Sequence, residues 1–71
     1  MKTYKLHEAM ELVLRDHNKQ WMNASDLADE INSRALYRKK DGSLLKGEQI
    51  RIRAYSYSHM FERDGAMVRL L

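Results

Sequence analysis

The 71-residue chain contains no cysteine and no proline, and it has only six aromatic residues and three glycines. The absence of cysteine excludes disulfides and cysteine-ligated zinc, so the covalent supports of many very small secreted domains are missing. Long apolar runs are absent too, and the sequence shows neither a signal peptide nor a membrane-spanning segment. These absences predict a cytoplasmic protein without a metal ion or another cofactor.

The length predicts a single domain over residues 1–71, because one domain usually takes roughly 100–200 residues. A hydrophobic fraction of 44% with 32% charged residues is typical of a folded globular chain rather than a disordered one. The sequence contains no glycine-rich phosphate loop, no serine-histidine-acid set that a domain of this size could preorganise and no paired carboxylates on a cleft. His7 begins a zinc-protease-like pattern, but Glu11 stands where the second histidine is required, and we interpret His7, His17 and His59 as surface residues. We therefore predict that the protein is not an enzyme.

Three segments repeat apolar residues at the three- and four-residue spacing of amphipathic helices. This spacing predicts helices over about residues 4–17, 23–35 and 47–60. Thr3 is expected to cap the first helix and Asn23 the second, since each side chain can accept a hydrogen bond from a free backbone N–H. The chain is therefore expected to be mainly helical.

The third helix has a poor N-cap, because only Lys46 or Gly47 is available, but its two faces are distinct. The row that the spacing turns inward comprises Ile50, Ala54, Tyr57 and Phe61. The residues turned outward are Gln49, Ile52, Tyr55, Ser56 and His59, with Arg51 and Arg53 on the flanks. Such a helix can present its outward face as a recognition surface.

Two short runs flank Asp64-Gly65, a dipeptide typical of a two-residue hairpin turn. We therefore expect a terminal β-hairpin over about residues 61–71. Trp21 and Met22 form an apolar pair that suits a minimal strand or a buried turn, and Trp21 is expected in the core. Three helices, a one-bridge strand before the second helix and a closing hairpin predict an α+β, mainly α fold, the winged helix-turn-helix.

The net charge of +3 is distributed unevenly along the chain. Residues 34–53 carry a net charge of +5, whereas the rest of the chain carries −2. Part of this basic segment is a loop over residues 36–47, in which Asp41-Gly42 suits a tight turn. The cations that precede the turn are Arg38, Lys39 and Lys40. A protruding loop with three positive charges suits contact with an anionic partner.

Several motifs of this basic region and of the hairpin occur together in one known group of domains. They are Leu36-Tyr37-Arg38-Lys39-Lys40-Asp41-Gly42, Gln49-Ile50 followed by Arg53, then Tyr57, Phe61 and Asp64-Gly65. With them the chain resembles HARE-HTH winged helices over about fifty residues, from Trp21 to the end. HARE-HTH domains are fused to restriction-modification and chromatin proteins and occur beside bacterial RNA polymerase. The resemblance implies a winged helix-turn-helix that associates with nucleic acid or docks onto a protein, without catalysis. Two positions depart from the family pattern, since Lys46-Gly47 lacks a serine-like cap and Ser58 replaces a proline.

These features predict a non-catalytic module that binds duplex DNA in transcription regulation or restriction-modification. The predicted nucleic-acid-binding residues are Arg38, Lys39, Lys40, Lys46, Gln49, Arg51, Ile52, Arg53, Ser56 and Arg63. The loop cations suit the phosphate backbone, whereas Gln49 suits an adenine edge and Ile52 a thymine methyl group in the major groove. Arg63 is the candidate contact from the wing. One such domain is expected to bind in the micromolar range or more weakly, so specificity needs a dimer or a fused domain.

The same residues also fit other roles. The basic segment fits a merely solvated surface, and Arg53 fits an ion pair with Asp26 or Glu30 that holds the helices together. The outward apolar residues fit a surface that docks onto a protein partner such as polymerase or a nuclease domain, and they are Ile52, Tyr55 and Met60. The sequence indicates neither the preferred DNA site nor the oligomeric state.

Overall fold

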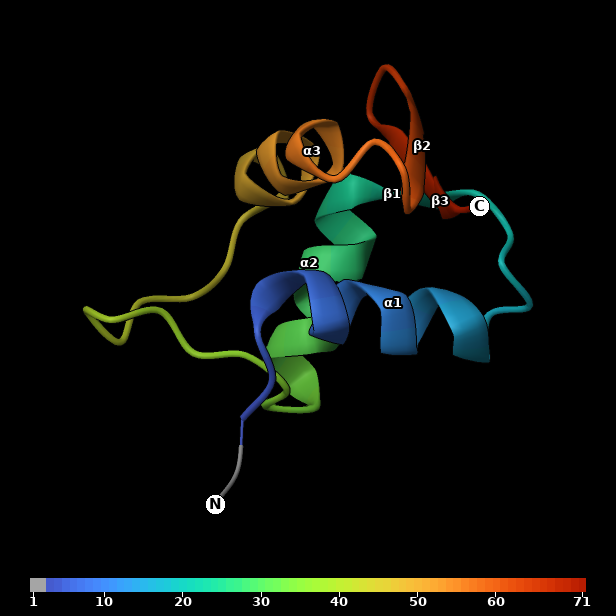
Figure 1. Ribbon diagram of the computed structural model, residues 1–71. Helices are drawn as coiled ribbons and strands as arrows, with labels where there is room; N and C mark the ends of the chain where they lie inside the picture. Colours follow the sequence, from blue (N-terminus) through green and yellow to red (C-terminus); the bar gives the residue numbers. More distant parts are fainter. Residues whose placement is uncertain (1–2) are drawn as a thin grey trace.

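The computed structural model describes residues 3–71, which form three helices and a three-stranded sheet. The elements are, in chain order, α1 (Leu6–Asp16), β1 (Met22–Asn23), α2 (Ala24–Ser33), α3 (Gly47–Ser56), β2 (Phe61–Asp64) and β3 (Met67–Leu70). In Figure 1, α2 lies between α1 and α3, the β2–β3 hairpin stands beside α3, and the loop after α2 projects on the side away from the hairpin. This order of elements is the one predicted from the sequence.

α1 begins after Lys5, whose backbone is extended and whose N–H donates to Glu8 Oε1 over 3.0 Å. The chain before Lys5 does not continue the helix, because the Tyr4 N–H donates to the Leu36 carbonyl oxygen (2.8 Å). The predicted helix start at residue 4 and the predicted Thr3 cap are therefore wrong. The conformation of this segment depends on a long-range backbone hydrogen bond, which a local sequence pattern does not predict.

α2 is capped as predicted, since Asn23 Oδ1 accepts a hydrogen bond from the Ser25 N–H (2.8 Å). At its other end the Leu36 N–H donates to the Ile31 carbonyl oxygen (3.1 Å), the long-range bond of a Schellman motif. This motif needs a left-handed residue just after the helix, and Ala35 has a φ of +54° there. Position 35 thus carries an alanine where such a motif usually carries glycine.

We expect Ala35→Gly to raise the free energy of unfolding by about 0.5–1 kcal/mol, because glycine adopts the left-handed conformation without a clash of its Cβ. For a domain of this size, the melting temperature should rise by roughly 3–6 °C. Ser33→Gly is the control, since it places glycine inside the last turn of α2 and should destabilise by up to about 1 kcal/mol. Thermal melts followed by circular dichroism measure both variants, and a lower melting temperature for Ala35→Gly contradicts the prediction.

α3 begins where predicted but ends at Ser56 instead of Met60. The chain leaves the helix at Tyr57, whose carbonyl oxygen accepts from the Met60 N–H (2.9 Å). The Met60 carbonyl oxygen in turn accepts from the Leu71 N–H (2.9 Å), so pairing with the chain after β3 replaces the last predicted helical turn. Tyr57, predicted to face the core, is half-buried and stacks on His7 with ring centroids 4.4 Å apart. His7 is therefore a packing residue rather than a free surface residue.

The predicted hairpin is present, with its turn one residue further along the chain. β2 and β3 pair antiparallel up to Asp64 with Met67, so the two loop residues are Gly65 and Ala66. Gly65 has a φ of +59°, which is the glycine conformation at the first loop position of a type II′ turn. The short strand predicted before α2 is β1, which pairs antiparallel with β3, and the sheet order is β1-β3-β2.

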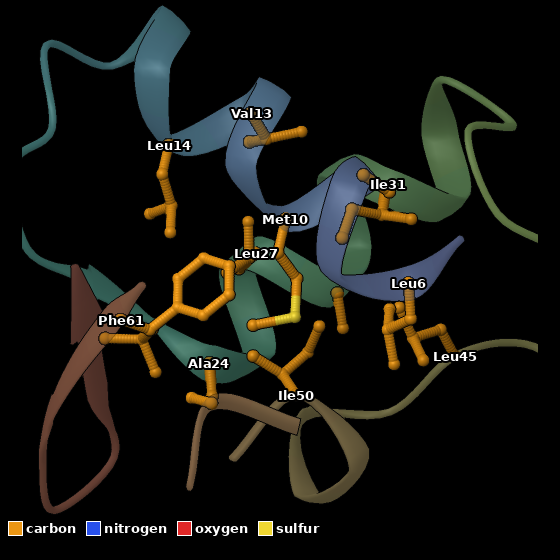
Figure 2. Close-up of a cluster of buried hydrophobic side chains, with 14 of the residues drawn as sticks. Leu6, Met10, Val13, Leu14, Ala24, Leu27, Ile31, Leu45, Ile50 and Phe61 are labelled. Atoms are coloured by element: carbon orange, nitrogen blue, oxygen red, sulfur yellow. The ribbon is translucent and has the colours of Figure 1, made fainter. Parts of the chain in front are cut away.

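The core lies where the three helices meet the sheet (Figure 2). Its buried side chains are Leu6, Ala9, Met10, Val13, Leu14, Ala24, Leu27, Ala28, Ile31, Leu45, Ile50, Ala54, Phe61, Val68 and Leu70. Trp21, predicted to lie in this core, is half-buried at its edge, where the Arg69 guanidinium carbon lies 4.7 Å from the centre of the ring. The domain is an α+β, mainly helical fold with the element order and the C-terminal hairpin of a winged helix.

Candidate nucleic-acid interface

The salt bridges within residues 3–71 leave the basic candidates of the predicted interface without a carboxylate partner. The cations that do form ion pairs are Arg15, His17, Arg34 and Arg69. The candidates outside these pairs are Arg38, Lys39, Lys40, Lys46, Arg51, Arg53 and Arg63. Among the described residues Arg53 pairs with neither Asp26 nor Glu30, so the helix-bracing ion pair suggested by the sequence is absent.

Arg34 is the member of the basic segment that does not belong to this surface. Its Nη1 donates to Asp16 Oδ2 at the end of α1 over 2.6 Å, and its Nη2 donates to Glu30. The hydrogen bond with Asp16 raises the pKa of the Arg34 guanidinium, and the charge of Glu30 adds to the effect. Glu30 also lies 2.9 Å from His17 Nε2. These contacts join the C-terminal ends of α1 and α2 and neutralise the charge of Arg34 locally.

The basic loop (residues 36–46) turns at Asp41-Gly42, as predicted. The Gly42 N–H donates to the Lys39 carbonyl oxygen (3.0 Å), and Asp41 Oδ1 accepts from the hydroxyl (2.7 Å) and N–H (2.9 Å) of Ser43. The Ser43 hydroxyl lowers the pKa of the Asp41 carboxyl, and the Ser43 N–H adds to the effect. Asp41 is therefore ionised at neutral pH and offsets one positive charge of the loop.

Asn32 of α2, which no sequence pattern singles out, holds the second half of the basic loop. Its Nδ2 donates to the Leu45 carbonyl oxygen (2.9 Å), and its Oδ1 accepts from the Leu45 N–H (3.0 Å). These two bonds hold Leu45 where its side chain enters the core, with only 4% of its surface exposed. Because Leu45 directly precedes the N-cap residue of α3, these two bonds tie α2 to the end of the basic loop, where α3 begins.

The start of α3 lies against the first turn of α2. A Cβ at position 47 would lie 2.9 Å from Ser25 Oγ, 3.0 Å from Ser25 N and 3.1 Å from Ser25 Cα. Gly47, which the sequence suggests only as a poor cap, thus permits a close approach of two helices. The cap comes instead from the half-buried Gln49, whose Oε1 accepts from the Lys46 N–H at 3.4 Å.

The outward face of α3 is exposed largely as predicted. Ile52 is 59% and Tyr55 72% exposed, and Arg51 and Ser56 are exposed beside them. Met60, predicted to extend this apolar surface, is half-buried and packs against the core. The exposed apolar part of the face therefore consists of Ile52 and Tyr55.

A surface cavity of about 200 Å³ lies between the basic loop and α3. Lys39 lines it from the loop, and Gln49, Ile52 and Arg53 line it from the helix. Arg53 is half-buried, and its guanidinium carbon lies 5.7 Å from the centre of the Tyr57 ring. The structure thus brings one predicted loop residue and three predicted helix residues together at this cavity, whereas the other candidates lie outside it.

The wing contributes one unpaired cation to this side of the molecule. Arg63 in β2 is exposed, and its guanidinium carbon lies 5.7 Å from the centre of the Tyr55 ring of α3. The other arginine of the hairpin, Arg69, is paired with Glu62 at 2.6 Å. The basic loop leads into the start of α3, and the hairpin stands beside the other end of this helix (Figure 1).

Comparison with protein-family models, with curated proteins and with solved structures found no match for this chain. The resemblance to HARE-HTH domains therefore rests on the residues that carry it. No helix within residues 3–71 is long and apolar enough to cross a membrane. In the same part of the chain no three histidine, aspartate or glutamate side chains gather as metal ligands. What this surface offers chemically is positive charge, hydrogen-bond donors and the exposed apolar side chains of Ile52 and Tyr55.

Proposed function

We propose that this domain is a non-catalytic module that binds duplex DNA through the basic loop, α3 and the hairpin. One observation carries the proposal: within residues 3–71 the candidate cations of the basic loop, α3 and β2 form no ion pair, whereas Arg15, His17, Arg34 and Arg69 do. Unpaired surface cations attract phosphates and gain affinity from the release of counterions. The HARE-HTH assignment, with a role in transcription regulation or restriction-modification, is part of the same proposal.

In the proposed complex the exposed face of α3 enters the major groove. Ile52 meets a thymine methyl group, and Arg51 reaches a guanine edge or a phosphate. Gln49 can pair with an adenine edge through both its amide oxygen and its N–H groups only after its Oε1 releases the Lys46 N–H that it now caps. The cations assigned to phosphates are Arg38, Lys39, Lys40 and Lys46 on the loop side and Arg63 on the hairpin side, and of these only Lys39 is half-buried.

We expect the double variant Lys39→Gln/Lys40→Gln to bind every duplex sequence roughly tenfold more weakly than the native chain, because phosphate contacts carry no sequence information. The slope of log K against log salt concentration should fall by about 1.8, since each phosphate contact contributes about 0.9. Fluorescence anisotropy with labelled duplexes of different sequence, at several salt concentrations, measures both quantities.

Lys19→Gln is the matched control, because Lys19 is an exposed cation in the connection between α1 and β1, outside the proposed interface. It should leave the affinity within about twofold. Equal losses for Lys19→Gln and the double variant would mean that only net charge matters. A nitrogen-proton NMR titration with a short duplex that gives no shifts at low salt would rule out DNA binding by this surface.

A docking role is the second candidate, and the exposure of Ile52 and Tyr55 on the same helix face favours it. The partner is then a protein of the transcription or restriction-modification machinery. Ile52→Asp should abolish capture of that partner, whereas Lys39→Gln/Lys40→Gln should leave capture unchanged. The opposite pattern favours the DNA-binding proposal.

A further inference from the structure

Two half-buried cations without a carboxylate partner line the same cavity between the basic loop and α3. Within residues 3–71 the half-buried lysine and arginine side chains are Lys39, Arg53 and Arg69. Arg69 has its anion, since its Nη2 lies 2.6 Å from Glu62 Oε1. In the same part of the chain Lys39 and Arg53 form no salt bridge, although Asp41 is near enough to feel the charge of Lys39, and both cations line the cavity of about 200 Å³. Because partial burial weakens the hydration of a charge, this pair favours an anion between them.

Gln49 adds hydrogen-bond donors to the same cavity. Its Oε1 is occupied by the Lys46 N–H at 3.4 Å, which leaves the two N–H groups of the amide to donate. The polar groups of the lining residues are thus two cations, the Gln49 amide and the Tyr37 hydroxyl. Such a wall repels a cation and suits a carboxylate, which accepts several hydrogen bonds at once.

The rest of the cavity wall is apolar and aromatic. Leu6 of α1 and Leu45 of the loop are buried and lie side by side at the edge of the core (Figure 2), and Tyr37 and Ile52 complete the wall. An apolar cavity of about 150 Å³ is large enough for a benzene ring. This cavity therefore has room for a six-membered ring with one small substituent, whereas a phosphate alone would leave the apolar wall in water.

We propose that this cavity binds a small aromatic carboxylate. The ring packs on the apolar wall, and the carboxylate meets Lys39, Arg53 and the amide of Gln49. These three residues also belong to the proposed DNA-binding surface, so the ligand and DNA compete. Only this competition rests on the proposed function, because the cavity and its wall exist without DNA.

The experiment is a titration of the chain with benzoate at fixed ionic strength and without DNA, followed by NMR of the backbone amides and of the methyl groups of Leu6, Leu45 and Ile52. We expect saturable shifts at these methyl groups. The Kd should be about a few millimolar, because so small a ligand forms few contacts. Benzyl alcohol has the ring without the charge, and acetate has the charge without the ring. Each of them, like inorganic phosphate, should bind at least about tenfold more weakly.

Two arginine variants distinguish the cavity from the general charge of α3. Arg53→Gln should weaken benzoate binding at least about fivefold, because it removes a cation from the cavity wall. Arg51→Gln removes an exposed arginine of the same helix outside the cavity and should leave the affinity unchanged. The NMR spectrum of each free variant reports whether its fold is intact.

Equal affinity for benzoate and acetate, or shifts spread over exposed lysines such as Lys19, overturns the proposal. Equal losses in Arg53→Gln and Arg51→Gln overturn it as well. Since the titration contains no DNA, benzoate binding can succeed where DNA binding fails, and the two proposals fail separately. If the chain binds both benzoate and DNA, saturating benzoate should weaken DNA binding by the native chain.

Discussion

Asn32→Ala should lower the free energy of unfolding by about 2–4 kcal/mol, a large part of the stability of so small a domain. The Asn32 amide donates to the Leu45 carbonyl oxygen (2.9 Å) and accepts from the Leu45 N–H (3.0 Å), and both bonds are part-buried. Alanine leaves a backbone donor and a backbone acceptor unpaired, and each costs about 1–3 kcal/mol. The melting temperature should therefore fall by roughly 10–20 °C in a calorimetric or circular dichroism melt.

The neighbouring exposed residue supplies the control, since Ser33→Ala should change the stability by less than about 0.5 kcal/mol. Asn32→Asp should also destabilise, because a carboxylate keeps an acceptor for the Leu45 N–H but cannot donate to the Leu45 carbonyl oxygen. The amide resonances of the basic loop should move in both Asn32 variants. Native stability in Asn32→Ala would mean that the buried Leu45 side chain holds the loop without the amide.

Local signals were sufficient for the elements and their order. The apolar spacing located three helices, the Asn23 side chain caps α2, and Asp-Gly dipeptides mark the loop turn and the hairpin. Each of these signals involves residues a few positions apart, so a sequence displays it directly. The errors in the helix bounds lie where distant backbone groups meet, at the Tyr4–Leu36 bond before α1 and the Leu71–Met60 bond after α3. A periodic pattern of apolar residues does not predict these backbone pairings.

The candidate site was predictable as a set of residue types but not as an arrangement. The sequence displays a basic segment, yet tertiary packing decides that Arg34 is neutralised by Asp16, 18 residues away. Packing also places Lys39 and Arg53 at the same cavity. Asn32 carries no distinctive signal, because an asparagine on the polar face of a helix usually faces water. The position of the basic loop relative to the helices therefore could not be predicted from the sequence.

Gly47→Val should lower the free energy of unfolding by about 3 kcal/mol, because α3 starts in close contact with α2. A Cβ at position 47 would lie 3.0 Å from Ser25 N and 3.1 Å from Ser25 Cα, and these backbone atoms cannot rotate away. The start of α3 must then move off α2. Gly47→Ala should have the same sign at about 1–2 kcal/mol, although alanine usually stabilises a helix relative to glycine. Chemical denaturation of the two variants measures both effects.

Glu48→Val is the matched control, since it puts the same side chain at the next, exposed position of α3 and should cost less than about 1 kcal/mol. Adding Ser25→Ala to Gly47→Val removes the hydroxyl oxygen at 2.9 Å but leaves the two backbone contacts, so it should restore only part of the stability. Complete restoration would show that one rotatable hydroxyl, and not the approach of the two helices, disfavours a side chain at position 47. In the folded fraction of Gly47→Val the resonances of Gln49 and Arg53 should also move, because a displaced α3 changes the cavity that both residues line.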